Sequence, residues 1–233
     1  MKIRKAKGRK DGCSGYTRVL GNEELGKLIS KVQSTVISNG TELERIIVSK
    51  SKEIKNLEEF IDNVTYENQE DGVYLCQKKI LKKSTKYNIA GIEPDLLIFI
   101  VERCRICKVI ELKDGDNFDT KKSQGEKEHL EQFAITFGAK IPFVTQYYIC
   151  SFNQLDKKHI KEGFKNKFEL EHIMTGKELC DLLNINYNDI IEKRKIDMED
   201  NINYFIDELI KITEVKDMIV KKLNVKYNNC LPN

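Results

Sequence analysis

Two acidic residues and a lysine stand at the ends of two apolar segments, where their types and spacing could support chemistry. Asp95 precedes the apolar run 96–100, and a second run, 109–113, contains Glu111 and ends at Lys113. Side chains alternate between the two faces of a strand, so Glu111 and Lys113 point the same way. If the two segments pair as a hairpin, Asp95 comes close to Glu111. The spacing therefore predicts two carboxylates and an ammonium group at one edge of a sheet.

Such a group of side chains predicts a site for a divalent cation. Two neighbouring carboxylates repel each other, and a cation between them relieves the repulsion. Hard oxygen ligands suit Mg2+, and the backbone carbonyl of Leu112 could supply one more. Lys113 could orient an attacking water and neutralise charge that builds up on a phosphate. Together these features predict metal-dependent hydrolysis of a phosphodiester bond.

The order Pro94-Asp95, fifteen intervening residues and Glu111-x-Lys113 resembles the motif of the PD-(D/E)XK nuclease superfamily. Length and context look most like a type II restriction endonuclease. The motif spans residues 94–113, with a plausible extension to 40–150. The resemblance implies an α/β fold with a restriction-endonuclease-like core, in which helices flank a mixed central β-sheet. It also implies sequence-specific cleavage of double-stranded DNA, 5′-phosphate and 3′-hydroxyl products, and a cognate DNA methyltransferase as a partner.

Other interpretations of the same residues remain open. One is a structure-specific or repair nuclease of the same superfamily. A second is a non-catalytic DNA-binding module that keeps a fossil site. The simplest is an amphipathic hairpin with a charged rim, since Glu-x-Lys is common in a chain with 40 Lys and Arg and 37 Asp and Glu.

A further candidate for the metal site is Glu44. Superfamily members commonly carry a glutamate on an early helix that reaches the metal, and Glu44 fits this better than Glu42. The pattern from residue 22 predicts a helix that Asn39-Gly40 breaks, with a second helix beginning at Thr41. Thr41-x-x-Glu44 is also a capping box, in which Glu44 would bond to the backbone instead. Both roles of Glu44 stay open at this point.

Candidate DNA contacts lie in two segments next to the motif. The loop 81–90 is basic and leads into the motif, which makes Lys86 a candidate for a backbone contact. Residues 120–138 predict a helix, and in the superfamily the helix after this strand often brings polar residues to the DNA. Its first turn carries Lys121, Lys122 and Gln124, which are assigned to phosphate contacts.

The chain divides into three segments on sequence grounds. Residues 1–20 are expected to form a loose basic arm that could lie along phosphates. Residues 21–185 are assigned to the nuclease core, with a strand at 142–152 and a polar, mobile-looking segment at 153–168. Residues 186–233 predict helices with an apolar stripe. That region either packs on the core or forms the interface of a homodimer, which would suit cutting both strands of a palindrome.

Net charge, absent motifs and the lengths of the apolar runs argue against several classes of protein. The net charge is only +3, so any DNA-binding surface must be a local patch. No Walker A or GxGxxG motif suggests nucleotide binding, and no GxSxG motif suggests a serine hydrolase. No apolar run is long enough for a membrane span, and seven cysteines without an export signal predict a reducing cytoplasm. Cys104 and Cys107 have metal-like spacing but lack a second pair, so they are expected to be turn cysteines.

Overall fold

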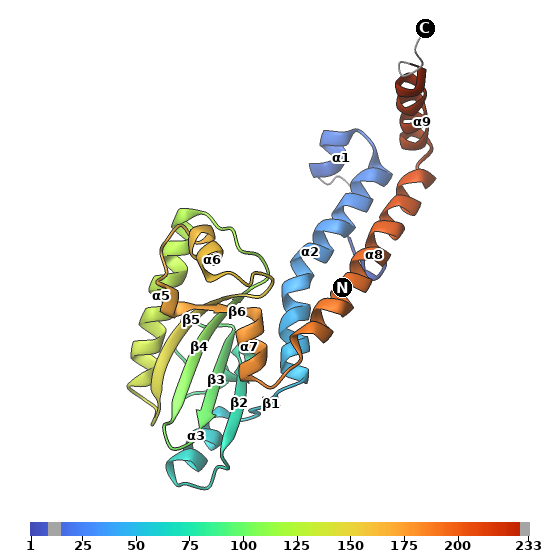
Figure 1. Cartoon of the computed structure of the whole chain (residues 1–233). Helices are drawn as coiled ribbons and strands as arrows, with labels where there is room; N and C mark the ends of the chain where they lie inside the picture. Colours follow the sequence, from blue (N-terminus) through green and yellow to red (C-terminus); the bar gives the residue numbers. More distant parts are fainter. Residues whose placement is uncertain (9–14, 229–233) are drawn as a thin grey trace. The chain divides into compact units, whose positions relative to one another are not determined.

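The computed structural model of the chain describes residues 1–8 and 15–228, with side chains up to residue 224 (Figure 1). It separates into two compact units. One consists of Met1–Glu42 together with the chain from Asn188 onward, and the other is Leu43–Tyr187. The second unit holds the motif residues and the sheet that positions them.

The sheet has six strands within the described residues, and their order in space is their order in the chain. β1 pairs with β2 in parallel, the pairs β2–β3 and β3–β4 are antiparallel, and the pairs β4–β5 and β5–β6 are parallel. The predicted mixed sheet flanked by helices is therefore confirmed. The strands are β1 (Lys52–Glu53), β2 (Gly72–Gln77), β3 (Leu96–Val101), β4 (Ile106–Lys113), β5 (Val144–Ser151) and β6 (Ile173–Thr175).

The predicted hairpin is formed by β3 and β4. Leu96 pairs with Ile110, so Asp95 and Glu111 follow at the same end of the sheet. At the other end, Cys104 lies exposed in the turn, whereas Cys107 is buried opposite Phe99. The expectation of turn cysteines is therefore correct for Cys104 and wrong for Cys107, which is part of β4, and both are free thiols.

Helices cover both faces of the sheet, with α5 on one side and α7 on the other (Figure 1). Side-chain alternation decides which residues meet them. Phe99 and Val109 point into a buried cluster that contains Phe133 and Phe137 of α5. Cys150 points to the opposite face, next to Cys180 of α7. In this unit the helices are α3 (Leu57–Thr65), α4 (Lys78–Leu81), α5 (Thr120–Gly138), α6 (Lys157–Gly163) and α7 (Gly176–Leu182), with a 3-10 turn at Leu170–His172.

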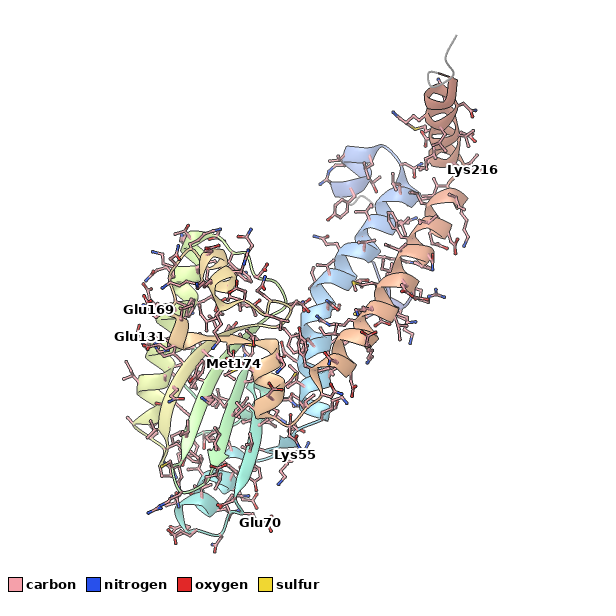
Figure 2. The ribbon with its side chains drawn as sticks, in the orientation of Figure 1. Lys55, Glu70, Glu131, Glu169, Met174 and Lys216 are labelled. Atoms are coloured by element: carbon pink, nitrogen blue, oxygen red, sulfur yellow. The ribbon has the colours of Figure 1, made fainter. Side chains whose placement is uncertain are left out.

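Figure 2 draws the side chains around this sheet and labels several that belong to its unit. Glu70, Glu131 and Glu169 are exposed at the periphery, whereas Met174 of β6 is buried. The polar rim and apolar interior are those expected of a folded α/β unit.

The predicted helix break at Asn39-Gly40 is wrong. Residues Glu23–Ser49 form one helix, α2, which runs through Gly40 and Thr41. Leu43 and Ile47 are buried at its end, and that burial outweighs the roughly 1 kcal/mol by which a helical glycine is unfavourable. Since Thr41 is inside the helix, it is not an N-cap, and the capping-box role of Glu44 is also wrong.

The segment 153–168 is not a mobile loop. It contains α6, whose N-cap is Asp156, and it buries Ile160, Phe164 and Phe168 completely. Gly163 packs directly against the backbone of Asp116, and a Cβ at this position would lie 1.6 Å from the Asp116 carbonyl oxygen. Apolar residues spaced among lysines therefore anchor this segment to the loop after β4.

The first unit ties the described start of the chain to α8. The amino group of Met1 lies 2.8 Å from Asp197, the backbone N–H of Ile3 donates to Asn201 and Arg4 pairs with Asp200. Residues 1–5 are consequently held by acidic and amide side chains and are not a loose arm, while residues 9–14 lie outside the described part. The helices α8 (Tyr187–Lys211) and α9 (Thr213–Asn228) agree with the predicted helical end. The helix α1 (Gly15–Leu20) and a 3-10 turn at Ile3–Lys5 lie within the segment predicted as a loose arm.

Within the described residues, no helix has both the length and the apolar character needed to span a membrane.

Candidate active site

Asp95 is fixed at the start of β3 by the neighbouring strand. Its Oδ2 accepts a hydrogen bond of 3.0 Å from the backbone N–H of Leu112. Its own carbonyl accepts from the N–H of Lys78 at 3.2 Å, which joins α4 to the same corner. Burial raises the pKa of Asp95 above its usual range, the Leu112 hydrogen bond opposes this, and the charge of Glu44 adds to the rise. The carboxylate is therefore positioned precisely in surroundings that disfavour its charge.

Glu111 and Lys113 point to the same side of β4, as the alternation predicts. The Lys113 Nζ donates to Glu111 Oε1 at 2.6 Å and to Glu126 Oε1 of α5 at 2.8 Å. Burial and the charge of Asp95 raise the pKa of Glu111 to about 7. Burial by itself would lower the pKa of Lys113, but the two carboxylates outweigh it, and the pKa is raised. The ammonium group is thus held charged between two carboxylates.

Glu44 belongs to the same electrostatic group. Burial raises its pKa, the charge of Glu111 raises it further, and Lys78 and Arg45 oppose the change. Glu42 instead pairs with the amino group of Met1 in the first unit. Glu44 therefore interacts electrostatically with the motif residues.

The donor set fits a hard divalent cation. Burial and, after it, the charge of Asp95 raise the pKa of Glu111, and a bound cation would relieve the repulsion between the two carboxylates. Among the described residues no three His, Cys, Asp or Glu side chains converge as a metal cluster. Two carboxylates completed by a backbone carbonyl, water and a substrate phosphate are nevertheless what Mg2+ commonly uses.

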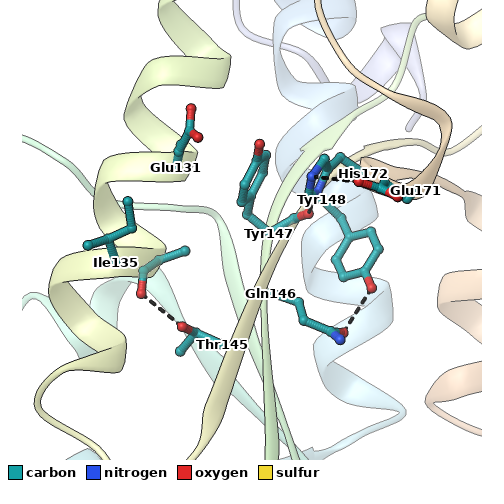
Figure 3. A pocket seen from close by; sticks show the side chains of 9 residues that line it. Glu131, Ile135, Thr145, Gln146, Tyr147, Tyr148, Glu171 and His172 are labelled. Carbon is teal, nitrogen blue, oxygen red and sulfur yellow. Dashed lines mark hydrogen bonds and ion pairs between the residues drawn. The ribbon is translucent and has the colours of Figure 1, made fainter.

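A cavity of about 190 Å3 adjoins these carboxylates. Its lining includes Glu111, Glu126, Lys78 and the segment 91–94. A larger cavity of about 420 Å3 lies between α5 and β5 (Figure 3) and is lined by Glu131, Glu171 and the stacked rings of Tyr147 and His172. The motif residues do not line that larger cavity, so the smaller one is the candidate active site.

The comparison with known proteins agrees with this chemistry. The chain is 63% identical over 223 residues to the type II restriction enzyme HhaII of Haemophilus parahaemolyticus, and the match covers 94% of this chain and 98% of the relative. The chain belongs to the type II restriction enzymes. It is therefore a sequence-specific DNA endonuclease. No family model matches the chain, and no solved structure matches it.

The predicted DNA contacts of this restriction enzyme lie on the surface, and their partners differ. Lys121 is exposed at the start of α5, and Lys122 lies over the ring of Phe118. Gln124 donates to Glu128 on its own helix, and Lys86 lies 3.5 Å from Asp62. These long side chains can exchange such exposed partners for phosphates, because surface pairs contribute little.

Two glutamates that contact the motif lysine or the loop before the motif were not predicted from the sequence. They are Glu126 and Glu58. Glu126 shares the face of α5 that carries Leu130 and Phe133, so a carboxylate within an apolar stripe could have drawn attention to it. Glu58 accepts hydrogen bonds from Ser84 and from the backbone N–H of Lys86, among others, and they lower its pKa to about 2. Glu58 thereby fixes the loop that leads into the motif.

The raised pKa of Glu111 predicts how the stability of the metal-free enzyme depends on pH. The folded enzyme binds this proton more tightly than the unfolded chain, whose value is near 4.5. This difference in pKa contributes folding stability on the order of 3 kcal/mol. The contribution is fully present below the unfolded-state pKa of 4.5, and it is lost as the pH rises through the folded-state pKa of about 7. Denaturation of the metal-free enzyme across this range should show the loss. Glu111→Gln should be much flatter, and an unchanged slope in that variant would contradict the assignment.

Proposed function

We propose that this restriction enzyme hydrolyses phosphodiester bonds of double-stranded DNA with Mg2+, by the chemistry of the PD-(D/E)XK superfamily. The observation that carries the proposal is the arrangement at the end of the hairpin. Asp95 accepts a hydrogen bond from the backbone N–H of Leu112, and Glu111 accepts one from Lys113. Leu112 lies between Glu111 and Lys113 on β4, so both contacts are made at the same point of the strand. This is the geometry in which two carboxylates and an ammonium group could act on one phosphate.

Each residue of the motif has a separate role in the proposed mechanism. Asp95 and Glu111 would hold Mg2+, with the carbonyl of Leu112 as a further ligand and Glu44 as an outer carboxylate. The bound cation would supply Lewis acidity and neutralise charge on the phosphate. Lys113 orients the attacking water and stabilises the charge that develops on the phosphate oxygens. In-line attack would leave a 5′-phosphate and a 3′-hydroxyl.

DNA would be held by side chains next to this corner. Lys121 and Lys122 stand in the first turn of α5, shortly after Lys113, and Gln124 follows them. Lys86 lies in the loop that Glu58 fixes. Contacts of this kind position the duplex and carry no sequence information by themselves.

A homodimer is part of the proposal, because both strands of a palindrome must be cut. Four apolar side chains of α8 repeat every four residues and are about half exposed or more, as a helix-to-helix contact would need. They are Met198 (58%), Ile202 (64%), Ile206 (50%) and Ile210 (49%). A cognate methyltransferase and a cytoplasmic location complete the proposal, because a restriction enzyme requires its host DNA to be protected.

The test is incubation of the purified protein with unmethylated phage DNA, with and without Mg2+. Discrete fragments only with Mg2+ are expected, and sequencing their ends would identify the recognition site and the 5′-phosphate. A smear would indicate cleavage without sequence specificity. Intact DNA in both reactions would overturn the proposed chemistry and favour a non-catalytic module.

A further inference from the structure

The core-facing stripe of α5 contains a carboxylate that packing does not require. Leu130 and Phe133 are buried, and Glu126 lies four and seven residues before them on the same face. At that position an apolar side chain would extend the core. Glu126 is instead only 21% exposed and directs Oε1 to within 2.8 Å of Lys113 Nζ.

Lys113 consequently contacts two carboxylates, of which only one is a proposed ligand of the cation. Glu111 is also the partner of a divalent cation in the proposed function, and it cannot serve the ammonium group and a cation equally well. Glu126 is the second carboxylate partner of the ammonium group, 2.8 Å from Nζ compared with 2.6 Å for Glu111. Of the two described contacts of the Lys113 ammonium group, the one with Glu126 can remain when Glu111 binds a cation.

We propose that Glu126 is a positioning residue that retains Lys113 and thereby frees Glu111 to bind the cation. The inference rests on the proposed function. Without the carboxylate of Glu126, the ammonium group pairs with Glu111 alone and competes with the cation for its oxygens. The loss of one negative charge near the site weakens cation binding further, because the attraction between charges is strong where water is largely excluded.

Two substitutions separate the charge of Glu126 from its hydrogen bond. Glu126→Gln keeps an oxygen that accepts from Lys113 but removes the charge, whereas Glu126→Ala removes both. For Glu126→Gln we expect the Mg2+ concentration at half-maximal effect to rise about tenfold, since a charged hydrogen-bond partner is roughly twice as strong as a neutral one. Its kcat at saturating Mg2+ should return close to that of the wild type. For Glu126→Ala, kcat should stay below that of the wild type even at saturating Mg2+. Once Glu111 binds the cation, no carboxylate remains to hold Lys113.

Binding is measured without catalysis, by titrating the DNA-free protein with Mg2+ alone and following its thermal stabilisation. The matched control is Glu131→Gln, which removes the same charge from an exposed position of the same helix. That control should leave both the Mg2+ titration and kcat unchanged. Duplex binding without metal should be the same in all variants.

Wild-type Mg2+ affinity and kcat in both Glu126 variants would overturn the inference. Equal effects of Glu126→Gln and Glu131→Gln would also overturn it, because a general charge effect would then be sufficient. These outcomes are distinct from failure of the proposed function, in which the wild type itself would show no Mg2+-dependent cleavage.

Discussion

Replacing Asp95 by Asn is expected to abolish DNA cleavage without making the enzyme less stable. The substitution removes a proposed ligand of Mg2+, and loss of several kcal/mol of charge stabilisation corresponds to a fall in kcat of about a thousandfold or more. The amide oxygen of the new side chain can still accept the hydrogen bond from Leu112. Burial and the charge of Glu44 raise the pKa of Asp95, so the ionised group is unfavourable in the folded, metal-free protein near neutral pH. An uncharged amide removes that unfavourable contribution, and the melting temperature should stay equal or rise.

Cleavage of a duplex carrying the recognition site and thermal denaturation without metal measure the two effects. The control is Asp71→Asn, an equivalent change at an exposed position just before β2, which should leave both properties unchanged. Cleavage by Asp95→Asn at a rate near that of the wild type would exclude Asp95 as a metal ligand. Loss of cleavage together with unfolding would mean that Asp95 serves the fold.

Replacing Lys113 by Met is expected to reduce kcat by about a hundredfold to a thousandfold, the usual effect of removing one group that stabilises a developing charge. In contrast to Asp95→Asn, this substitution should also lower stability. Glu111 and Glu126 have side chains only 14% and 21% exposed, and both would lose their ammonium partner. Leaving such groups without a partner costs about 1–3 kcal/mol in unfolding free energy.

Mg2+ should restore part of this lost stability, because a cation can neutralise the carboxylates that Lys113 no longer neutralises. The stabilisation by Mg2+ should therefore be larger in Lys113→Met than in the wild type, whereas Lys140→Met, at an exposed position after α5, should behave as the wild type does. Equal stabilisation in all three proteins would show that Lys113 and the cation do not share these carboxylates.

Much of the hairpin could be predicted because its information is local. Alternation along 109–113 places Glu111 and Lys113 on one face, and the lengths of the two apolar runs set the register that brings Asp95 to Leu112. The helix predicted at residues 120–138 is α5, and the side chain of Asp119 caps its first turn. The capping box between Thr175 and Glu178 at the start of α7 is another feature set by local sequence.

Local patterns failed where burial supplied by distant segments decided the structure. Asn39-Gly40 is a weak helix former, but burial of Leu43 and Ile47 keeps α2 continuous. The lysines of 153–168 suggested a loop, but Phe164 and Phe168 are buried beneath them. In both cases a few apolar side chains outweigh the average polarity of the segment.

The sequence by itself determined the α/β fold, the hairpin and the placement of Asp95 and Glu111 at the same end of the sheet, because strand periodicity and short connections act over a few residues. Only the tertiary structure decided that Glu126 shares Lys113 and that Glu44 interacts with Glu111 instead of capping a helix. Both outcomes depend on how α5 and the end of α2 pack against the sheet. A charge in a sequence has no partner until packing sets the distances, and electrostatic interaction falls steeply with distance and with exposure to water.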